Sequence, residues 1–86
     1  MRVVTPERAQ KAIRARGADG RLMISQTAEQ RFRRQGVTLR DVRQALSTAF
    51  ECEQQPDGNW KLRGHDLDGE DLVLVVTIAE RALVVL

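Results

Sequence analysis

Apolar residues recur with a helical period in the first part of the chain and with a period of two after residue 49. The clearest stripe has the i, i+3, i+4, i+7 spacing of a helix with one buried face: Val42, Ala45, Leu46 and Ala49. Thr38 followed by Asp41 forms a capping-box pattern just before this stripe. We therefore predict a helix that starts after Thr38 and packs on a core, with Arg40 and Arg43 facing outward.

A first helix is indicated near the N-terminus. Thr5 is a good N-cap, Pro6 suits the first helical position, and Gly17 suits the C-terminal cap. Apolar residues are few in this segment, so we expect weak packing and basic side chains largely in water: Arg8, Lys11, Arg14 and Arg16. The apolar stretch 22–24 is short, and we interpret it as an extended connector.

A second helix is predicted between this connector and the clear stripe. Thr27 with Gln30 forms another capping-box pattern, and Gly36 is typical of a helix end. Ala28 and Phe32 fall one turn apart on the same side of this helix. That side is expected to face the core.

The second half of the chain reads as a series of strands. Four segments show strand patterns, separated by turn residues: 50–55, 60–65, 72–78 and 82–86. The third segment is apolar on both faces, which is typical of a central strand. We predict a single α+β domain over residues 1–86, with N-terminal helices packed on an antiparallel four-stranded sheet.

Charge is divided unevenly between the two halves. Residues 1–43 hold eleven Lys and Arg against four acids, or +7, and residues 44–86 hold three against eight, or −5, which together give the formal +2. Such a division points to a nucleic-acid or acidic partner. Three explanations stay open: neutralisation by the acids of the second half, binding of nucleic acid, or binding of an acidic protein.

Composition excludes several classes of protein. Cys52 is the only cysteine, so an intrachain disulfide and a cysteine zinc cluster are both excluded. The longest apolar run, 72–79, is too short to span a bilayer, and no signal peptide is evident, so we expect a cytoplasmic protein without a membrane partner. Phe32, Phe50 and Trp60 are too few aromatics for a typical base-stacking surface.

Segment 27–46 resembles the opening of the domain of unknown function 4258 family. The usual form there is His-Ala-x-x-Arg-Met-x-x-Arg-Gly-Ile, followed by a Thr/Ser-x-x-Asp-Val cap and helix. Arg31 and Gly36 match this form, whereas Thr27 stands in place of the histidine and Gln35 in place of the second arginine. The hairpin at 58–64 and the valine-rich closing strands also resemble the family, so the resemblance covers about residues 22–86.

The resemblance implies a small α+β fold similar to toxins of the RelE and MqsR type. Those proteins cleave messenger RNA and are neutralised by an antitoxin protein, often a DNA-binding one. No cofactor is implied. If the family histidine acts as a catalytic base in relatives, this chain lacks that base at Thr27.

The candidate chemistry lies on one predicted strand. Lys61, Arg63 and His65 alternate along one face, with steps of roughly 6–7 Å, which can bracket one phosphate. Metal-independent RNA cleavage needs proton transfer and cations near the phosphate, and a histidine can exchange protons near neutral pH. Arg31 and Arg34 could add contacts to the RNA backbone. We expect these four cations to converge on one side, with His65 close by.

Three alternatives remain. The strand face could be simply solvated, with His65 beside Asp66 in a turn. The chain could be a catalytically silent module of the same fold that binds a protein partner or RNA. It could also form a homodimer through the first helix or an edge strand.

Overall fold

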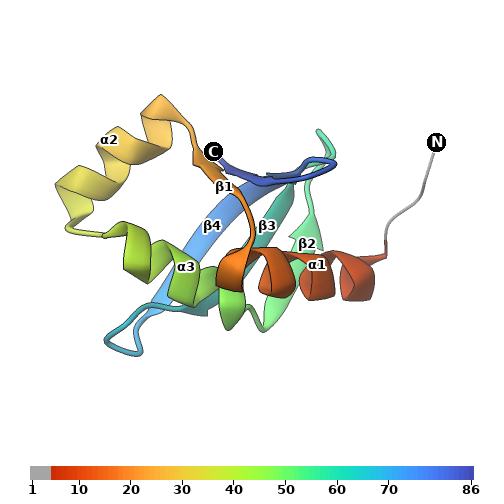
Figure 1. The fold of residues 1–86 in the computed structure, drawn as a ribbon, viewed down its shortest axis with the longest axis horizontal. Helices are drawn as coiled ribbons and strands as arrows, with labels where there is room; N and C mark the ends of the chain where they lie inside the picture. The colour runs from red at the N-terminus through yellow and green to blue at the C-terminus, as the bar shows by residue number, and fades with distance from the viewer. Residues whose placement is uncertain (1–4) are drawn as a thin grey trace.

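The computed structural model describes residues 5–86 and shows an α+β fold with three helices and one five-stranded sheet (Figure 1). The elements in chain order are α1 (Pro6–Asp19), β1 (Leu22–Ile24), α2 (Gln26–Gln35), α3 (Leu39–Ser47), β2 (Glu51–Gln54), β3 (Trp60–His65), β4 (Asp71–Ile78) and β5 (Leu83–Val85). The general α+β class predicted from the sequence is confirmed. Within residues 5–86, the helices are too short or too polar to cross a membrane.

The sheet contains one strand more than the sequence predicted. Its order is β1-β5-β4-β3-β2, and β2 to β5 form the expected antiparallel meander with β4 at the centre. Strand β1 pairs in parallel with β5, which places Leu22 beside Leu83 and Ile24 beside Val85. The predicted four-stranded antiparallel sheet is therefore wrong, because the short stretch 22–24 is a strand and not a connector.

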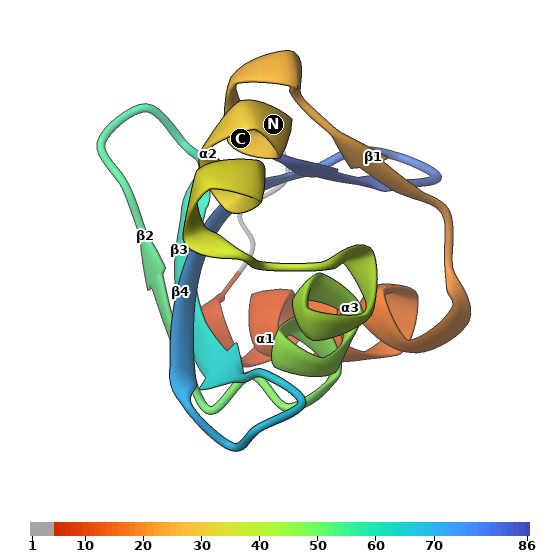
Figure 2. The same ribbon diagram turned by 90° about the vertical axis from the view of Figure 1, so that its left-hand side faces the viewer.

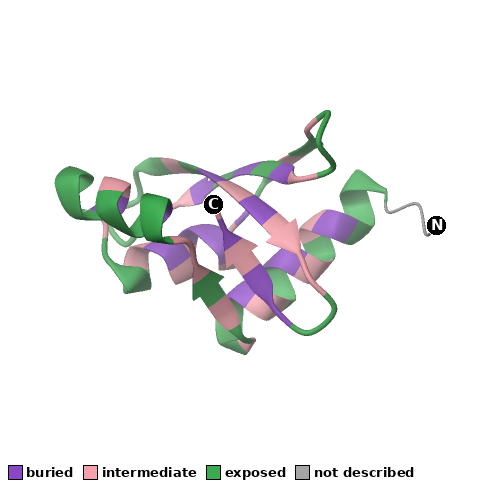
Figure 3. Cartoon of the chain, turned by 90° about the horizontal axis from the view of Figure 1, so that it is seen from above, coloured by how far each residue is buried: buried purple, intermediate pink, exposed green. Residues whose placement is uncertain are grey.

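Helices α1 and α3 lie side by side on one face of the sheet (Figure 2). The largest fully buried side chains come from both layers: Ile13, Val42, Leu46, Leu62, Leu74, Val76, Leu83 and Val85. Trp60 is 3% exposed and belongs to this core. Buried residues recur every fourth position along α1, at Ala9, Ile13 and Gly17 (Figure 3).

Close contact between α1 and α3 depends on Gly17. The sequence predicted that Gly17 ends the first helix, which is wrong: α1 continues to Asp19 and Gly20 is its C-cap. Gly17 lies inside the helix, and a Cβ atom there would collide with Cβ of Leu46. Glycine is therefore needed for packing at this position and not for chain reversal.

The other helix ends follow local capping chemistry. Thr5 caps α1 by accepting from the backbone N–H of Arg8, and Thr38 with Asp41 completes the predicted capping box of α3. Gly36 ends α2 in the left-handed conformation, with φ of 71°. The predicted N-cap Thr27 is wrong, because Ser25 accepts from the backbone N–H of Ala28 and α2 begins at Gln26.

Candidate functional site

The candidate residues of β3 point away from the two packed helices. Trp60, Leu62 and Gly64 are buried toward the core, whereas Lys61 and Arg63 are exposed and His65 is half-buried. The predicted alternation along this strand is confirmed. We call the surface formed by Glu51, Glu53, Lys61, Arg63, His65 and Asp71 the outer sheet face.

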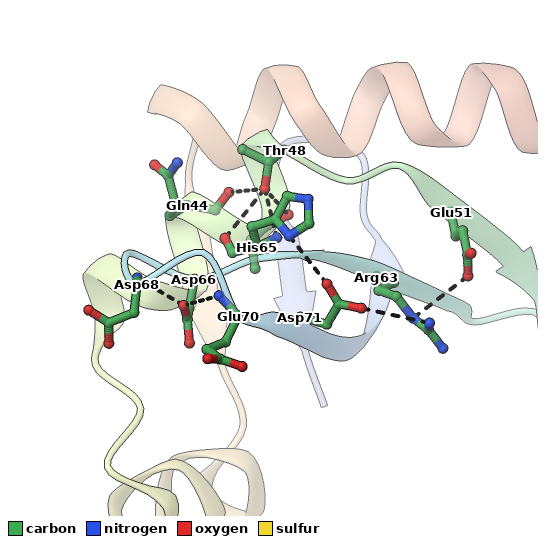
Figure 4. Close-up of polar contacts among 10 residues, drawn as sticks. Gln44, Thr48, Glu51, Arg63, His65, Asp66, Asp68, Glu70 and Asp71 are labelled. Carbon is green, nitrogen blue, oxygen red and sulfur yellow. Dashed lines mark hydrogen bonds and ion pairs between the residues drawn. The ribbon is translucent and has the colours of Figure 1, made fainter.

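Arg63 lies between two carboxylates on this face (Figure 4). Its Nε is 3.7 Å from Oε2 of Glu51, and its Nη1 is 3.8 Å from Oδ2 of Asp71. Glu51 is the cross-strand neighbour of Arg63, so the sheet register fixes the first pair. Such exposed pairs contribute little to stability, but they compensate the charge of Arg63. A phosphate would have to compete with these carboxylates.

His65 is oriented by three neighbours, of which Asp71 and Thr48 are labelled in Figure 4. Its Nδ1 lies 3.3 Å from Oδ1 of Asp71, and its ring stacks on Phe50 with centroids 4.9 Å apart. Its backbone N–H donates to Oγ1 of Thr48 at 2.9 Å. Nδ1 is shielded from solvent and makes no hydrogen bond with the described residues, so its contact with Asp71 is electrostatic. The side chain is 45% exposed, and this exposure therefore lies on the other ring atoms.

Lys61 differs from Arg63 because no ion pair within residues 5–86 involves it. Its cross-strand neighbours are Glu53 on β2 and Val75 on β4. Lys61 and Arg63 also line a pocket that extends toward α1 and Phe50. The cation of this face that is free of direct carboxylate contact is thus Lys61.

Cys52 lines the same pocket from β2 and is half-buried. Burial raises the pKa of the Cys52 thiol, because it disfavours the charged thiolate. Cys52 packs against the core like a small hydrophobe, and the pocket therefore has no activated nucleophilic sulfur.

The two predicted arginines of α2 are not joined to the β3 residues. Arg31 donates from Nη2 to the carbonyl of Leu86 at 2.9 Å, and Arg34 is exposed. Leu86 bonds to Val75, the cross-strand neighbour of Lys61, so Arg31 reaches the sheet near the Lys61 end. Among the described residues, no hydrogen bond or ion pair links Arg31 or Arg34 to Lys61, Arg63 or His65.

Several arginines of the first half bind backbone carbonyls, which the sequence did not reveal. Arg14 donates from Nε to Ser47 at 3.2 Å, and Arg43 donates from Nη1 to Gly17 and Gly20, both at 3.3 Å. Arg16 donates to three carbonyls of the β4–β5 turn, those of Ala79, Glu80 and Ala82. The expectation that Arg16 lies largely in water is therefore wrong.

The acids of the second half do not form ion pairs with these cations. Of the cations in residues 5–43, Arg33 alone pairs with a carboxylate, that of Glu29 at 2.8 Å. Acids near the β3–β4 turn bind backbone instead: Oδ1 of Asp66 accepts from Asp68 and Glu70, both at 2.9 Å. Direct neutralisation of the first half by the second is thus not observed in the described residues.

Asp41 ties the helical layer to the β3–β4 turn. One oxygen accepts from the backbone N–H of Thr38 at 3.0 Å, and the other accepts from that of Leu67 at 3.1 Å. The Thr38 bond, followed by the Leu67 bond, lowers the pKa of Asp41 below its ordinary value. The turn that follows His65 is thereby fixed against the start of α3.

The chain matches no family model, and it has no significant match among curated proteins or solved structures. The family resemblance therefore remains a prediction.

Proposed function

We propose that this protein is a toxin-type component of a toxin–antitoxin pair and that it cleaves RNA without a metal ion. The observation that carries the proposal is the setting of His65, whose Nδ1 faces Asp71 while the rest of its ring is accessible on the strand face that also carries Arg63 and, one step further, Lys61. The predicted family resemblance supplies the class of protein, and the geometry supplies the group that would move protons.

The reaction is an attack of a ribose 2′-oxygen on the adjacent phosphorus. Nε2 of His65 takes the 2′-hydroxyl proton as the new P–O bond forms, and Asp71 stabilises the resulting imidazolium. The P–O5′ bond breaks, and the imidazolium returns its proton to the departing 5′-oxygen. Lys61 stabilises the charge of the pentavalent phosphate. The products are a 2′,3′-cyclic phosphate and a free 5′-hydroxyl, with no net redox change.

Arg63 determines whether the carboxylate of Asp71 interacts with one partner or with two. Both oxygens of Asp71 are in use, Oδ2 toward Arg63 and Oδ1 toward His65. When Arg63 binds a phosphate, it loses its contact with Asp71. The carboxylate of Asp71 then interacts with His65 alone. Arg31 and Arg34 remain predicted contacts for the RNA backbone beyond the cleaved bond, and an antitoxin protein remains the predicted partner.

The test is induction of the chain in a bacterial host beside His65→Ala, with growth and transcript integrity as readouts. We expect growth arrest and transcript cleavage, both lost in His65→Ala. Gln55→Ala, a change in the β2–β3 turn away from His65, is the matched control and should behave as wild type. Normal growth with intact transcripts would remove the enzymatic proposal. Purified protein should cleave RNA equally well with a metal chelator present.

A second candidate is a catalytically silent module that binds RNA or a protein partner. Two observations favour it: carboxylates hold Arg63 on both sides, and Thr27 stands where the resembled family has histidine. RNA binding by the purified chain without any cleavage would select this candidate over the first.

A further inference from the structure

A second cationic surface lies on the helical layer, away from the sheet. Helices α1 and α3 run antiparallel, because Arg14 reaches Ser47 at the end of α3 while Arg43 reaches Gly17 and Gly20 at the end of α1. The side chains that follow this seam are mostly exposed. We call them the seam cations: Lys11, Arg14, Arg40 and Arg43.

Arg14 and Arg43 are held in place without losing their charge. Each donates to carbonyls at the C-terminal end of the opposite helix, where a cation is favoured by the helix dipole. A carbonyl orients a guanidinium but does not neutralise it as a carboxylate does. Each guanidinium carries five N–H donors, so both retain several for an external anion. Their side-chain order is achieved before any ligand arrives, which lowers the entropic cost of binding.

The seam cations form no ion pair with an acid within residues 5–86. Glu7 of α1 lines a pocket with Lys11 and Arg14 without pairing with either. The nearest acid of α3, Asp41, is occupied by backbone N–H groups of Thr38 and Leu67. Lys11 and Arg14 are three residues apart, as are Arg40 and Arg43, which corresponds to about 4.5 Å of helix rise. This density of cations fits a ligand with closely repeated negative charges.

The seam also lacks the means to bind unstacked bases. Trp60 and Phe32 are buried in the core, and Phe50 lies at the pocket on the sheet side. Proteins that hold single strands rely on aromatic platforms, so this surface suits a phosphate backbone whose bases are already stacked. A double-helical nucleic acid meets that description.

The seam extends to the turn that follows His65. A groove at its α3 side is lined by Ala18, Arg40, Arg43, Gln44, Ser47 and Leu67. Ser47 is followed by Thr48, whose hydroxyl bonds the backbone of His65, and Leu67 lies two residues beyond His65 (Figure 4). A backbone lying in the groove would therefore reach the turn that follows His65, whereas the His65 side chain faces Asp71 on the outer sheet face.

We infer that the α1–α3 seam binds the phosphate backbone of a double-helical segment of nucleic acid, without reading its sequence. This goes beyond the proposed function, because the seam lies on the helical layer and the proposed cleavage residues lie on the outer sheet face. Binding on the seam is a separate event from cleavage and can be measured alone.

The test measures the affinity of the full chain for a short labelled RNA duplex and for a DNA duplex of the same sequence, by fluorescence anisotropy across a salt series. We expect binding whose affinity falls steeply with salt. The double variant Lys11→Gln/Arg40→Gln should bind about tenfold more weakly and lower the salt slope by about 2. Neither side chain makes a hydrogen bond within the described residues, so the fold should be unaffected.

Arg33→Gln/Arg81→Gln is the matched control, because it removes the same charge from α2 and the β4–β5 turn. We expect its affinity to stay within about twofold of wild type, since only diffuse attraction is lost. Equal losses in both double variants, or binding insensitive to salt, would overturn the proposal. Equal affinity for the two duplexes would identify the shared phosphate backbone as the ligand, and a preference for RNA would identify the A-form helix. This assay measures binding and not cleavage. A lack of catalysis by His65 therefore cannot be mistaken for a lack of binding on the seam.

Discussion

The outer sheet face and the α1–α3 seam use arginine in opposite ways. On the sheet, Arg63 is flanked by the carboxylates of Glu51 and Asp71, so its charge is compensated. On the seam, Arg14 and Arg43 are bound by carbonyls, which fix the side chains and leave the charge. The bonding partner of a cation thus decides whether its charge is compensated within the fold or stays available to a polyanion.

The seam can be broken at its closest contact. Gly17→Val places a branched side chain against Leu46 and should push α1 and α3 apart. We expect a loss of about 3 kcal/mol in the free energy of unfolding, because overpacking at a tight contact is costly. Urea denaturation measures this loss. Ala18→Val, at the exposed neighbouring position, should cost only about 0.6 kcal/mol through helix propensity. Equal losses of stability in the two variants would show that α1 and α3 can move apart without an energetic cost.

The sheet network can be opened at Asp71. Asp71→Asn removes the charge that faces His65 and one of the two charges that face Arg63. If His65 moves protons, RNA cleavage should fall about tenfold or more, because the imidazolium is no longer stabilised. Affinity for the RNA duplex should stay constant or rise, since a negative charge is lost. Asp68→Asn in the nearby turn is the control, and cleavage reduced equally in both variants would contradict this role for Asp71.

The two modes of arginine binding should differ in their effect on stability. Arg43→Gln removes two hydrogen bonds from a half-buried guanidinium, and we expect a loss of about 1 kcal/mol. Arg63→Gln breaks two exposed ion pairs, and its effect should lie within about 0.5 kcal/mol of zero. Thermal or urea denaturation of both variants in parallel measures the difference. A larger loss of stability in Arg63→Gln than in Arg43→Gln would mean that the ion pairs of the outer sheet face stabilise the fold more than the carbonyl hydrogen bonds of the seam.

The smallest expected effect concerns the link between the seam and the turn after His65. Because the pKa of Asp41 is lowered in the folded state, its carboxylate stabilises the fold above the ordinary carboxyl pKa near 3.8. That contribution disappears as pH falls through the lowered folded-state pKa. Asp41→Asn should therefore be less stable than wild type at neutral pH, and the difference should vanish in strong acid. Unfolding curves of wild type and Asp41→Asn at pH 7 and near pH 2 test this. The same difference in stability at both pH values would show that the charge of Asp41 is not the cause.

Local chemistry made parts of this structure predictable. The caps at Thr5 and Thr38 and the left-handed end at Gly36 depend on neighbouring residues, so the sequence was sufficient for them. The alternation of Lys61, Arg63 and His65 follows from strand geometry in the same way. The pairing of His65 with Asp71 was not predicted, because it depends on the register that the β3–β4 turn sets.

Other features depend on tertiary contacts that a single sequence does not encode locally. Gly17 has the appearance of a helix end, and only the approach of Leu46 explains it as an interior residue. Strand β1 exists because β5 lies beside it, although its three residues carry no pattern of their own. The carbonyl partners of Arg14 and Arg43 lie on the opposite helix, so a count of charges along the sequence could not predict these hydrogen bonds.

The most direct test of the difference between the two faces is an NMR titration of the labelled protein with the RNA duplex. If the seam binds the backbone, amide signals of α1, α3 and residues 47–48 and 66–67 should shift together with one affinity. Amides of β2 and of α2 should remain in place. Shifts confined to β2, β3 and α2, with α1 and α3 unchanged, would contradict binding on the seam. They would instead show that the RNA binds the outer sheet face.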